Sequence, residues 1–161
     1  MDANRNRSLL IQFLTSSIFL LLSVSFAHAA AITLNLTSGY VGDTVKINGT
    51  AFGANEQGIV VIFNSTTVTL TGVDGTPTNA NGTVNASASG AWNATFVVPA
   101  QVRGVHVLNA SGNTTTGGVT TTFTINPRIT TFSPTSGYVG DTTLITGTGF
   151  ANESLTAQLD G

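Results

Sequence analysis

The seven-residue phrase SGYVGDT occurs twice in this 161-residue chain, at Ser38 to Thr44 and again at Ser136 to Thr142. The match extends without gaps, because LTSGYVGDTVKINGTAFGANE from Leu36 aligns with PTSGYVGDTTLITGTGFANES from Pro134. The two copies lie 98 residues apart. That spacing is too long for a solenoid unit and fits one β-sandwich of about 100 residues. The repeat therefore predicts one full domain followed by the opening of a second.

Apolar and polar residues alternate with period 2 in several stretches after residue 30. The alternation predicts half-buried strands over residues 44–48, 92–98 and 119–125. In the second of these strands, Trp92 and Phe96 fall on the apolar face, so we expect both in a hydrophobic core. Trp92 is also open to interpretation as a platform for stacking sugars, but its phase favours the core.

Three further stretches have the composition of strands. Residues 58–63 form a continuous apolar run that predicts a central strand, residues 67–70 could return as its neighbour, and residues 104–108 predict another strand. No stretch after residue 30 has a helical period. Strands separated by Gly, Asn and Pro predict an all-β fold, an antiparallel β-sandwich. Residues 71–88 are rich in Asn and Thr, and the sequence leaves open whether they form a strand or a loop.

The first 29 residues have the pattern of an export signal. Arg5 and Arg7 precede an apolar stretch from Leu9 to Phe26, and Ala27-His28-Ala29 is a small-x-small cleavage site. We expect a signal helix in residues 1–29, cleaved after Ala29. The alternative is an uncleaved anchor, since the apolar stretch is just long enough to span a bilayer.

The repeat sets the domain boundaries. We expect a sandwich over residues 30–126 and the start of a second, truncated domain over residues 127–161, with Pro127-Arg128 at the junction. Half a sandwich exposes an apolar face and open sheet edges. The sequence is therefore expected to be an incomplete reading of a longer protein. The alternative is a partial domain that pairs with a strand from a partner.

Each copy of the phrase is expected to build a turn. Gly39 and Gly42 would permit positive φ, and the carboxylate of Asp43 would cap the turn. Asp141 is its counterpart in the second copy. Tyr40 and Tyr138 are candidate exposed aromatics that could pack across the junction between successive domains.

Charge and cysteine content limit the possible partners. After residue 29 the chain has three positive and six negative side chains, so we expect no nucleic-acid binding. A charge-poor surface rich in Thr and Asn is typical of exported proteins. The absence of cysteine excludes disulfides and favours a bacterial or archaeal surface protein over a small exported eukaryotic domain.

Three segments resemble the IPT/TIG group of immunoglobulin-like domains found as tandem arrays in prokaryotic surface proteins. They are PRITTFSPTSGYVGDTTLITGTGF from Pro127, SGAWNATFVVPA from Ser89, and RGVHVLNASGNTTTGGVTTTFTINP from Arg103. The resemblance implies a non-catalytic immunoglobulin-like β-sandwich with a stalk, adhesion or surface-layer role. The stretch from Thr71 to Ala88 departs most from the family pattern.

Asn-x-Ser/Thr sequons are the one dense motif, covering nine of the twelve asparagines after residue 30. We expect an N-glycosylated surface. Strand alternation alone also places a Thr two residues after an Asn, and this explains Asn48 and Asn93 best. The candidate glycosylation sites are Asn35, Asn48, Asn64, Asn81, Asn85, Asn93, Asn109, Asn113 and Asn152.

The sequence offers no convincing catalytic or cofactor motif. No Ser-His-Asp set, phosphate loop or pair of carboxylates can be placed. His106 alternates with two valines, so we expect it to point to water. Bound calcium is conceivable near Asp43, Asp74 or Asp141, but isolated turn aspartates are more often caps.

These observations favour a non-enzymatic, exported module of tandem repeats, at the cell surface, acting as a stalk, adhesin or coat subunit. The expected partners are neighbouring domains of the same chain and other surface proteins or glycans. Membrane contact is expected only through the signal segment or an anchor outside this sequence. The alternatives are an accessory module of a secreted enzyme whose catalytic domain lies beyond residue 161, and a lone carbohydrate-binding domain.

Overall fold

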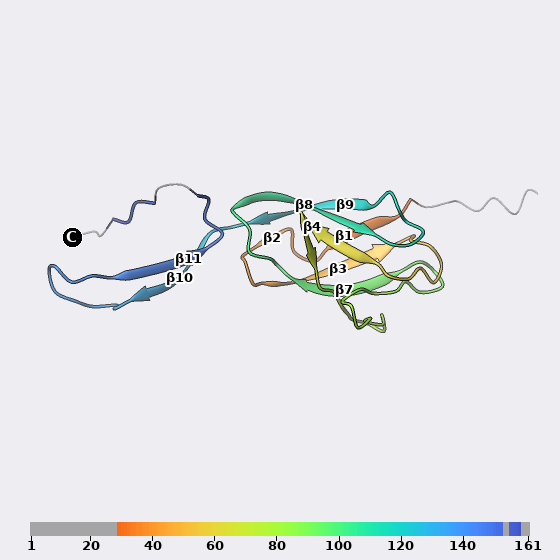
Figure 1. The fold of residues 1–161 in the computed structure, drawn as a ribbon, viewed down its shortest axis with the longest axis horizontal. Coiled ribbons are helices and arrows are strands. Elements are labelled where there is room, and N and C mark those ends of the chain that lie inside the picture. The colour runs from red at the N-terminus through yellow and green to blue at the C-terminus, as the bar shows by residue number, and fades with distance from the viewer. Residues whose placement is uncertain (1–28, 153–154, 159–161) are drawn as a thin grey trace, which may run out of the picture.

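The computed structural model describes residues 29–152 and 155–158, and every regular element within them is a β-strand (Figure 1). The all-β prediction is confirmed for these residues. The expected signal helix in residues 1–29 falls almost wholly outside them. Within the described part of the chain, no helix is long and apolar enough to cross a membrane.

Two sheets enclose one core, an arrangement consistent with a β-sandwich. The four-stranded sheet has the order β1 (Ala31–Leu34), β3 (Thr44–Thr50), β7 (Trp92–Val97), β6 (Thr71–Gly72). The five-stranded sheet has the order β2 (Ser38–Gly39), β9 (Val119–Ile125), β8 (Gly104–Ser111), β4 (Val60–Phe63), β5 (Thr66–Val68). Neighbouring strands are antiparallel except β2 and β9, which are parallel.

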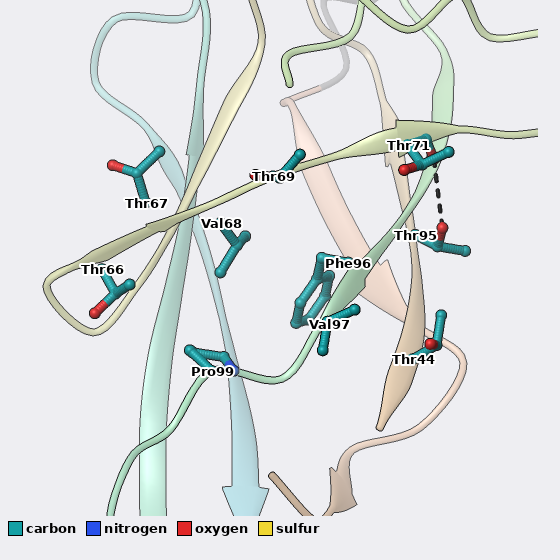
Figure 2. Close-up of a pocket in the computed structure, with 10 residues that line it drawn as sticks. All are labelled: Thr44, Thr66, Thr67, Val68, Thr69, Thr71, Thr95, Phe96, Val97 and Pro99. Carbon is teal, nitrogen blue, oxygen red and sulfur yellow. Dashed lines mark hydrogen bonds between the residues drawn. The ribbon is translucent and has the colours of Figure 1, made fainter. Parts of the chain in front are cut away.

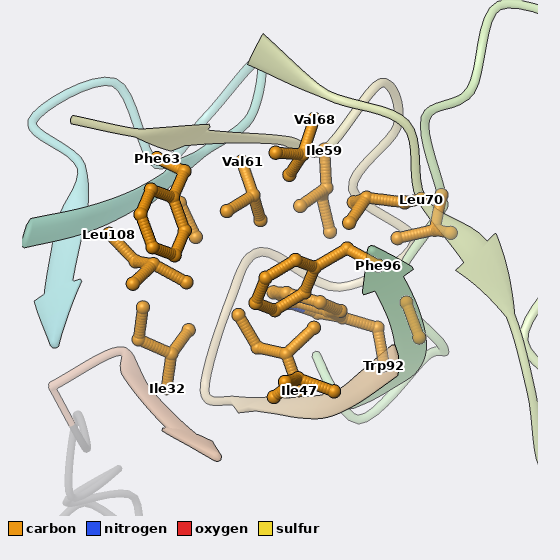
Figure 3. Close-up of a cluster of buried hydrophobic side chains, with 14 of the residues drawn as sticks. Ile32, Ile47, Ile59, Val61, Phe63, Val68, Leu70, Trp92, Phe96 and Leu108 are labelled. Carbon is orange, nitrogen blue, oxygen red and sulfur yellow. The ribbon is translucent and has the colours of Figure 1, made fainter. Parts of the chain in front are cut away.

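The predicted alternation explains the core. In β7 the residues Trp92, Ala94 and Phe96 are buried while the residues between them are not, and β3 alternates in the same way. Figure 3 shows Trp92 and Phe96 of one sheet packed among Val61, Phe63 and other side chains of the opposite sheet. The predicted central strand at residues 58–63 is confirmed as β4, which lies between β8 and β5.

The stretch from Thr71 to Ala88, which the sequence left open, is mostly a packed loop. After the two-residue strand β6 it carries only isolated bridges, from Val84 to Ile59 and to Thr78. Val84 and Ala86 nevertheless lie in the core. The segment is therefore held by these buried side chains and by scattered hydrogen bonds, such as the one from the Ala86 amide to the Glu56 carbonyl, rather than by a ladder.

The prediction for His106 was wrong. In β8 the inward-facing residues are His106, Leu108 and Ala110, whereas Val105 and Val107 are exposed. Nε2 of His106 lies 2.7 Å from the Val102 carbonyl oxygen and must donate to it, because a carbonyl only accepts. Leu108 and Ala110, at the far end of the strand, determine which of its residues face the core. The prediction considered residues 104–108 only, where two valines outnumber Leu108.

A separate hairpin follows the sandwich. Strand β10 (Arg128–Ser133) pairs with β11 (Leu144–Thr148), and Figure 1 shows this hairpin extending away from the end of the sandwich. Phe132 lies opposite Ile145, just as Leu34 lies opposite Ile47 in β1 and β3. A register shift between Ile129 and Thr131 then brings Ile129 opposite Gly147.

That register shift preserves the apolar pattern of the first copy. In the first copy the buried Ile32 lies opposite Gly49, and in the second copy Ile129 takes the same place opposite Gly147. The gap-free alignment would have put Thr130 there. The hairpin thus reproduces the two apolar pairings that open the first sandwich, with one extra residue in β10 between them.

Candidate functional site

The first copy of the repeated phrase forms a tight turn between β2 and β3. The Tyr40 amide donates to Oδ2 of Asp43 at 2.8 Å, and the Asp43 amide donates to the Tyr40 carbonyl at 3.1 Å. Gly42 has a φ of 90°, a conformation that side chains with a Cβ rarely adopt. The expected cap by Asp43 and the expected positive φ of Gly42 are both confirmed.

The second copy forms the same turn. The Tyr138 amide donates to Oδ2 of Asp141 at 2.7 Å, the Asp141 amide donates to the Tyr138 carbonyl at 3.0 Å, and Gly140 has a φ of 96°. Since the residues around this turn are mostly exposed, the turn geometry is a property of the seven residues themselves.

The role predicted for Gly39 was wrong, because its φ is not positive. A Cβ at Gly39 would lie 2.8 Å from Oδ2 of Asp43 and 3.1 Å from Cζ of Phe123. Gly137 is in the same position, with Oδ2 of Asp141 at 2.9 Å from such a Cβ. This glycine is needed for the close approach of the capping carboxylate, and not for backbone conformation.

Arg128, the first residue of β10, lies on the first turn. Its guanidinium carbon is 4.8 Å from the centre of the Tyr40 ring, a cation–π distance. Its Nη2 donates to the Val41 carbonyl at 3.4 Å, and its Nη1 lies 3.9 Å from Oδ1 of Asp43. The sequence analysis placed Arg128 at the junction and Tyr40 as a residue that could pack across it, but it did not predict that the two side chains meet. The tripeptide Asn-Pro-Arg, which follows the last strand, was the feature of the sequence that could have pointed to this contact.

The two tyrosines differ in their surroundings although their turns are alike. Tyr40 is 37% exposed and faces Arg128, whereas Tyr138 is 90% exposed. The neighbouring Val139 is fully exposed as well. The second turn therefore presents the same groups as the first, and no arginine among the described residues contacts them.

The nine sequon asparagines all reach the surface to some degree. Those at exposed positions are Asn35, Asn64, Asn81, Asn113 and Asn152, and those at half-buried positions are Asn48, Asn85, Asn93 and Asn109. The Oδ1 atom of Asn109 is buried, and the Asn85 side chain bonds to Asn79 and to the Gly58 amide.

Two of the half-buried sequon asparagines are neighbours. Asn48 of β3 lies directly opposite Asn93 of β7. Cβ atoms of such a cross-strand pair are about 5 Å apart. A glycan on one of these residues would therefore cover the amide of the other.

Glu56 is a buried carboxylate that the sequence analysis did not single out. Its Oε1 accepts hydrogen bonds from the Thr114 and Thr115 amides, and its Oε2 accepts from the Gly53 amide and the Thr115 hydroxyl. Burial alone would raise the pKa of Glu56, but these hydrogen bonds outweigh it and lower the pKa from 4.5 to about 2. Glu56 thus fastens the loop after β8 to the loop after β3.

A shallow cleft of about 340 Å³ opens where the chain passes from β5 to β6 (Figure 2). Six threonines line it, and the Thr95 hydroxyl donates to the Thr71 carbonyl at its edge. No acidic or basic side chain lines this cleft. It offers hydroxyl groups for hydrogen bonding but no group for proton transfer near neutral pH.

The aspartates considered for calcium have other partners or stand apart. Asp43 caps its turn beside Arg128, and Asp74 pairs with Lys46. Among the described residues, no group of three or more His, Asp or Glu side chains is placed to hold a metal ion. Trp92 is fully buried, as its phase predicted, so its ring is covered by protein.

Comparisons with protein-family models, with curated proteins and with solved structures gave no match for this chain.

Proposed function

We propose that this chain is an exported, non-enzymatic module of the cell surface, built from tandem immunoglobulin-like repeats. The strand orders support an immunoglobulin-like fold. One sheet follows the order A-B-E-D and the other the order G-F-C, with short additional strands at the edges of the second sheet. Such rigid units on short linkers suit a stalk, adhesin or coat that holds a partner away from the cell.

The observation that carries the proposal is the repeated pairing register. The hairpin of β10 and β11 opens a second unit in the way that β1 and β3 open the first. Only Asn126 and Pro127 separate the last strand of the sandwich from β10. So short a linker favours units stacked end to end over units that reorient freely about a flexible linker.

The surface chemistry supports exposure outside the cell. Five sequon asparagines lie at exposed positions, where glycans can be attached without disturbing the core. The signal pattern in residues 1–29 supplies the route of export. Neighbouring domains, surface proteins and glycans are the partners that fit such a module.

The titratable side chains support a structural role. Glu56 fastens two loops, Asp43 and Asp141 cap turns, and His106 donates to a backbone carbonyl inside the sandwich. Each of these groups is already engaged by the protein itself. This engagement favours a non-enzymatic module over a hydrolytic site on the sandwich.

Labelling of intact source cells tests the proposal. A membrane-impermeant amine reagent should label the protein, whose mature chain should begin at Ala30 and so carry an accessible α-amine as well as Lys46. N-terminal sequencing of the labelled material gives the cleavage point. A protein that is labelled only after lysis and retains residues 1–29 would contradict export.

A further inference from the structure

We propose that the SGYVGDT turn is a receptor for arginine. In the first copy it holds the arginine that begins the next unit, and the second copy, Ser136 to Thr142, is built to hold the arginine of a following repeat. The inference rests on the proposed tandem organisation and adds the contact that joins one repeat to the next.

The topology of the sandwich brings the arginine to the turn. Strand β2 pairs in parallel with β9, so that Gly39 lies beside Ile125. The Asn126 amide then donates to the Gly39 carbonyl at 2.8 Å, which keeps the two segments together past the strand ends. Because both run in the same direction, Arg128 emerges beside the turn that follows Gly39.

The turn offers three groups that suit a guanidinium. They are the face of the Tyr40 ring, the Val41 carbonyl and Oδ1 of Asp43, and Arg128 reaches all three. The other carboxylate oxygen of Asp43 accepts from the Tyr40 amide, so the cap also aims Oδ1 outward. A planar fork with several donors can use a ring, a carbonyl and a carboxylate together, whereas the compact ammonium of lysine cannot.

The second turn has the same internal bonds and the same three groups. Tyr138, Val139 and Asp141 are the counterparts, and the Asp141 cap is as short as that of Asp43. Tyr138 is 90% exposed, against 37% for Tyr40. The segment that fits this turn is an extended strand followed by Asn-Pro-Arg, running parallel to residues 136–137 as residues 124–128 run beside Ser38 and Gly39.

Fluorine NMR of the full chain tests the first receptor. The chain has two tyrosines, so 3-fluorotyrosine gives one signal for each turn. Replacing Arg128→Ala should shift the Tyr40 signal and leave the Tyr138 signal in place. Arg128→Lys should produce most of the same shift. An unchanged chemical shift of the Tyr40 signal in Arg128→Ala would overturn the inference.

The same spectrum tests the second receptor. The probe is a synthetic peptide of residues 121–130, TTFTINPRIT, added up to millimolar concentration. The peptide should shift the Tyr138 signal but not the Tyr40 signal, whose turn is already occupied, and its Arg→Ala version should shift neither. An unmoved Tyr138 signal, or an equal shift with guanidinium ion alone, would refute recognition of this segment.

These outcomes are separate from the test of export. The spectrum of the purified chain depends on the turns alone, whereas labelling of cells depends on the location of the protein. Failure of one leaves the result of the other intact.

Discussion

Gly49→Ala should unfold the sandwich at markedly lower denaturant concentration. Gly49 lies in β3 directly opposite Trp92 of β7, and the indole covers it. A Cβ at this position would overlap Nε1 and Cε2 of the indole and would lie 2.7 Å from Cζ2. Trp92 is fully buried and packs edge-on against Phe52 at 5.4 Å, so the indole has no free space to enter.

The magnitude follows from the cost of overpacking a core. Inserting a methyl group into a well-packed core costs about 1–3 kcal/mol, and the cost is at the upper end where the neighbour cannot move. We therefore expect a loss of roughly 3 kcal/mol in the free energy of unfolding. For a sandwich of this size, that corresponds to a fall in Tm of roughly 10–20 °C.

The assay can use the protein's own fluorescence. Trp92 is the single tryptophan, so its emission reports directly on the perturbed site during urea denaturation. The matched control is Gly117→Ala, because a Cβ there meets no atom within 4 Å and the φ of Gly117 is not positive. Equal midpoints for the two variants, with unchanged Trp92 emission in Gly49→Ala, would refute the packing described for this core.

Three further predictions follow from individual residues. Because the pKa of Glu56 is lowered to about 2, its stabilisation is present above pH 4.5 and is lost as the pH falls toward 2. Acid titration of the unfolding free energy should lose about 3 kcal/mol over that range, and Glu56→Gln should abolish that dependence. Gly42→Ala should cost about 1 kcal/mol in thermal unfolding because φ is 90° and no atom crowds the site, and an unchanged Tm would contradict the left-handed turn. In material from a host that glycosylates, mass spectrometry should find glycans at the exposed Asn64 and Asn113 and not at both Asn48 and Asn93 of one molecule, which lie side by side. Double occupancy of that pair would show that β3 and β7 are not paired in the register described.

The strands were predictable because their signal is local. Alternation in residues 44–48 and 92–98 fixes which side chains face the core. Only one face of each sheet is buried, so a shift of one residue would turn the apolar side chains toward water. His106 was mispredicted because the two valines beside it suggest that they face the core and that the histidine faces water. Only the full strand, which includes Leu108 and Ala110, shows that His106 lies on the buried face. A histidine can take such an inward position when a backbone carbonyl accepts a hydrogen bond from its ring N–H.

The contacts between distant segments were not predictable from the sequence. Arg128 meets Tyr40 only because β2 and β9 run in parallel, and no local pattern specifies that pairing. Glu56 lies in an ordinary polar loop, and its partners Thr114 and Thr115 come from the loop after β8, distant in the sequence. The caps at Asp43 and Asp141, by contrast, act within four residues and could be inferred from the phrase alone.

The most direct test of the account is the pairing register of the two hairpins, measured by cross-strand proton contacts in a labelled full chain. The account predicts contacts between Leu34 and Ile47 and between Phe132 and Ile145, with Ile129 rather than Thr130 opposite Gly147. Finding these contacts in both hairpins would establish that the repeated phrase opens two successive units. Contacts in the first hairpin together with their absence or a different register in the second would contradict the central claim.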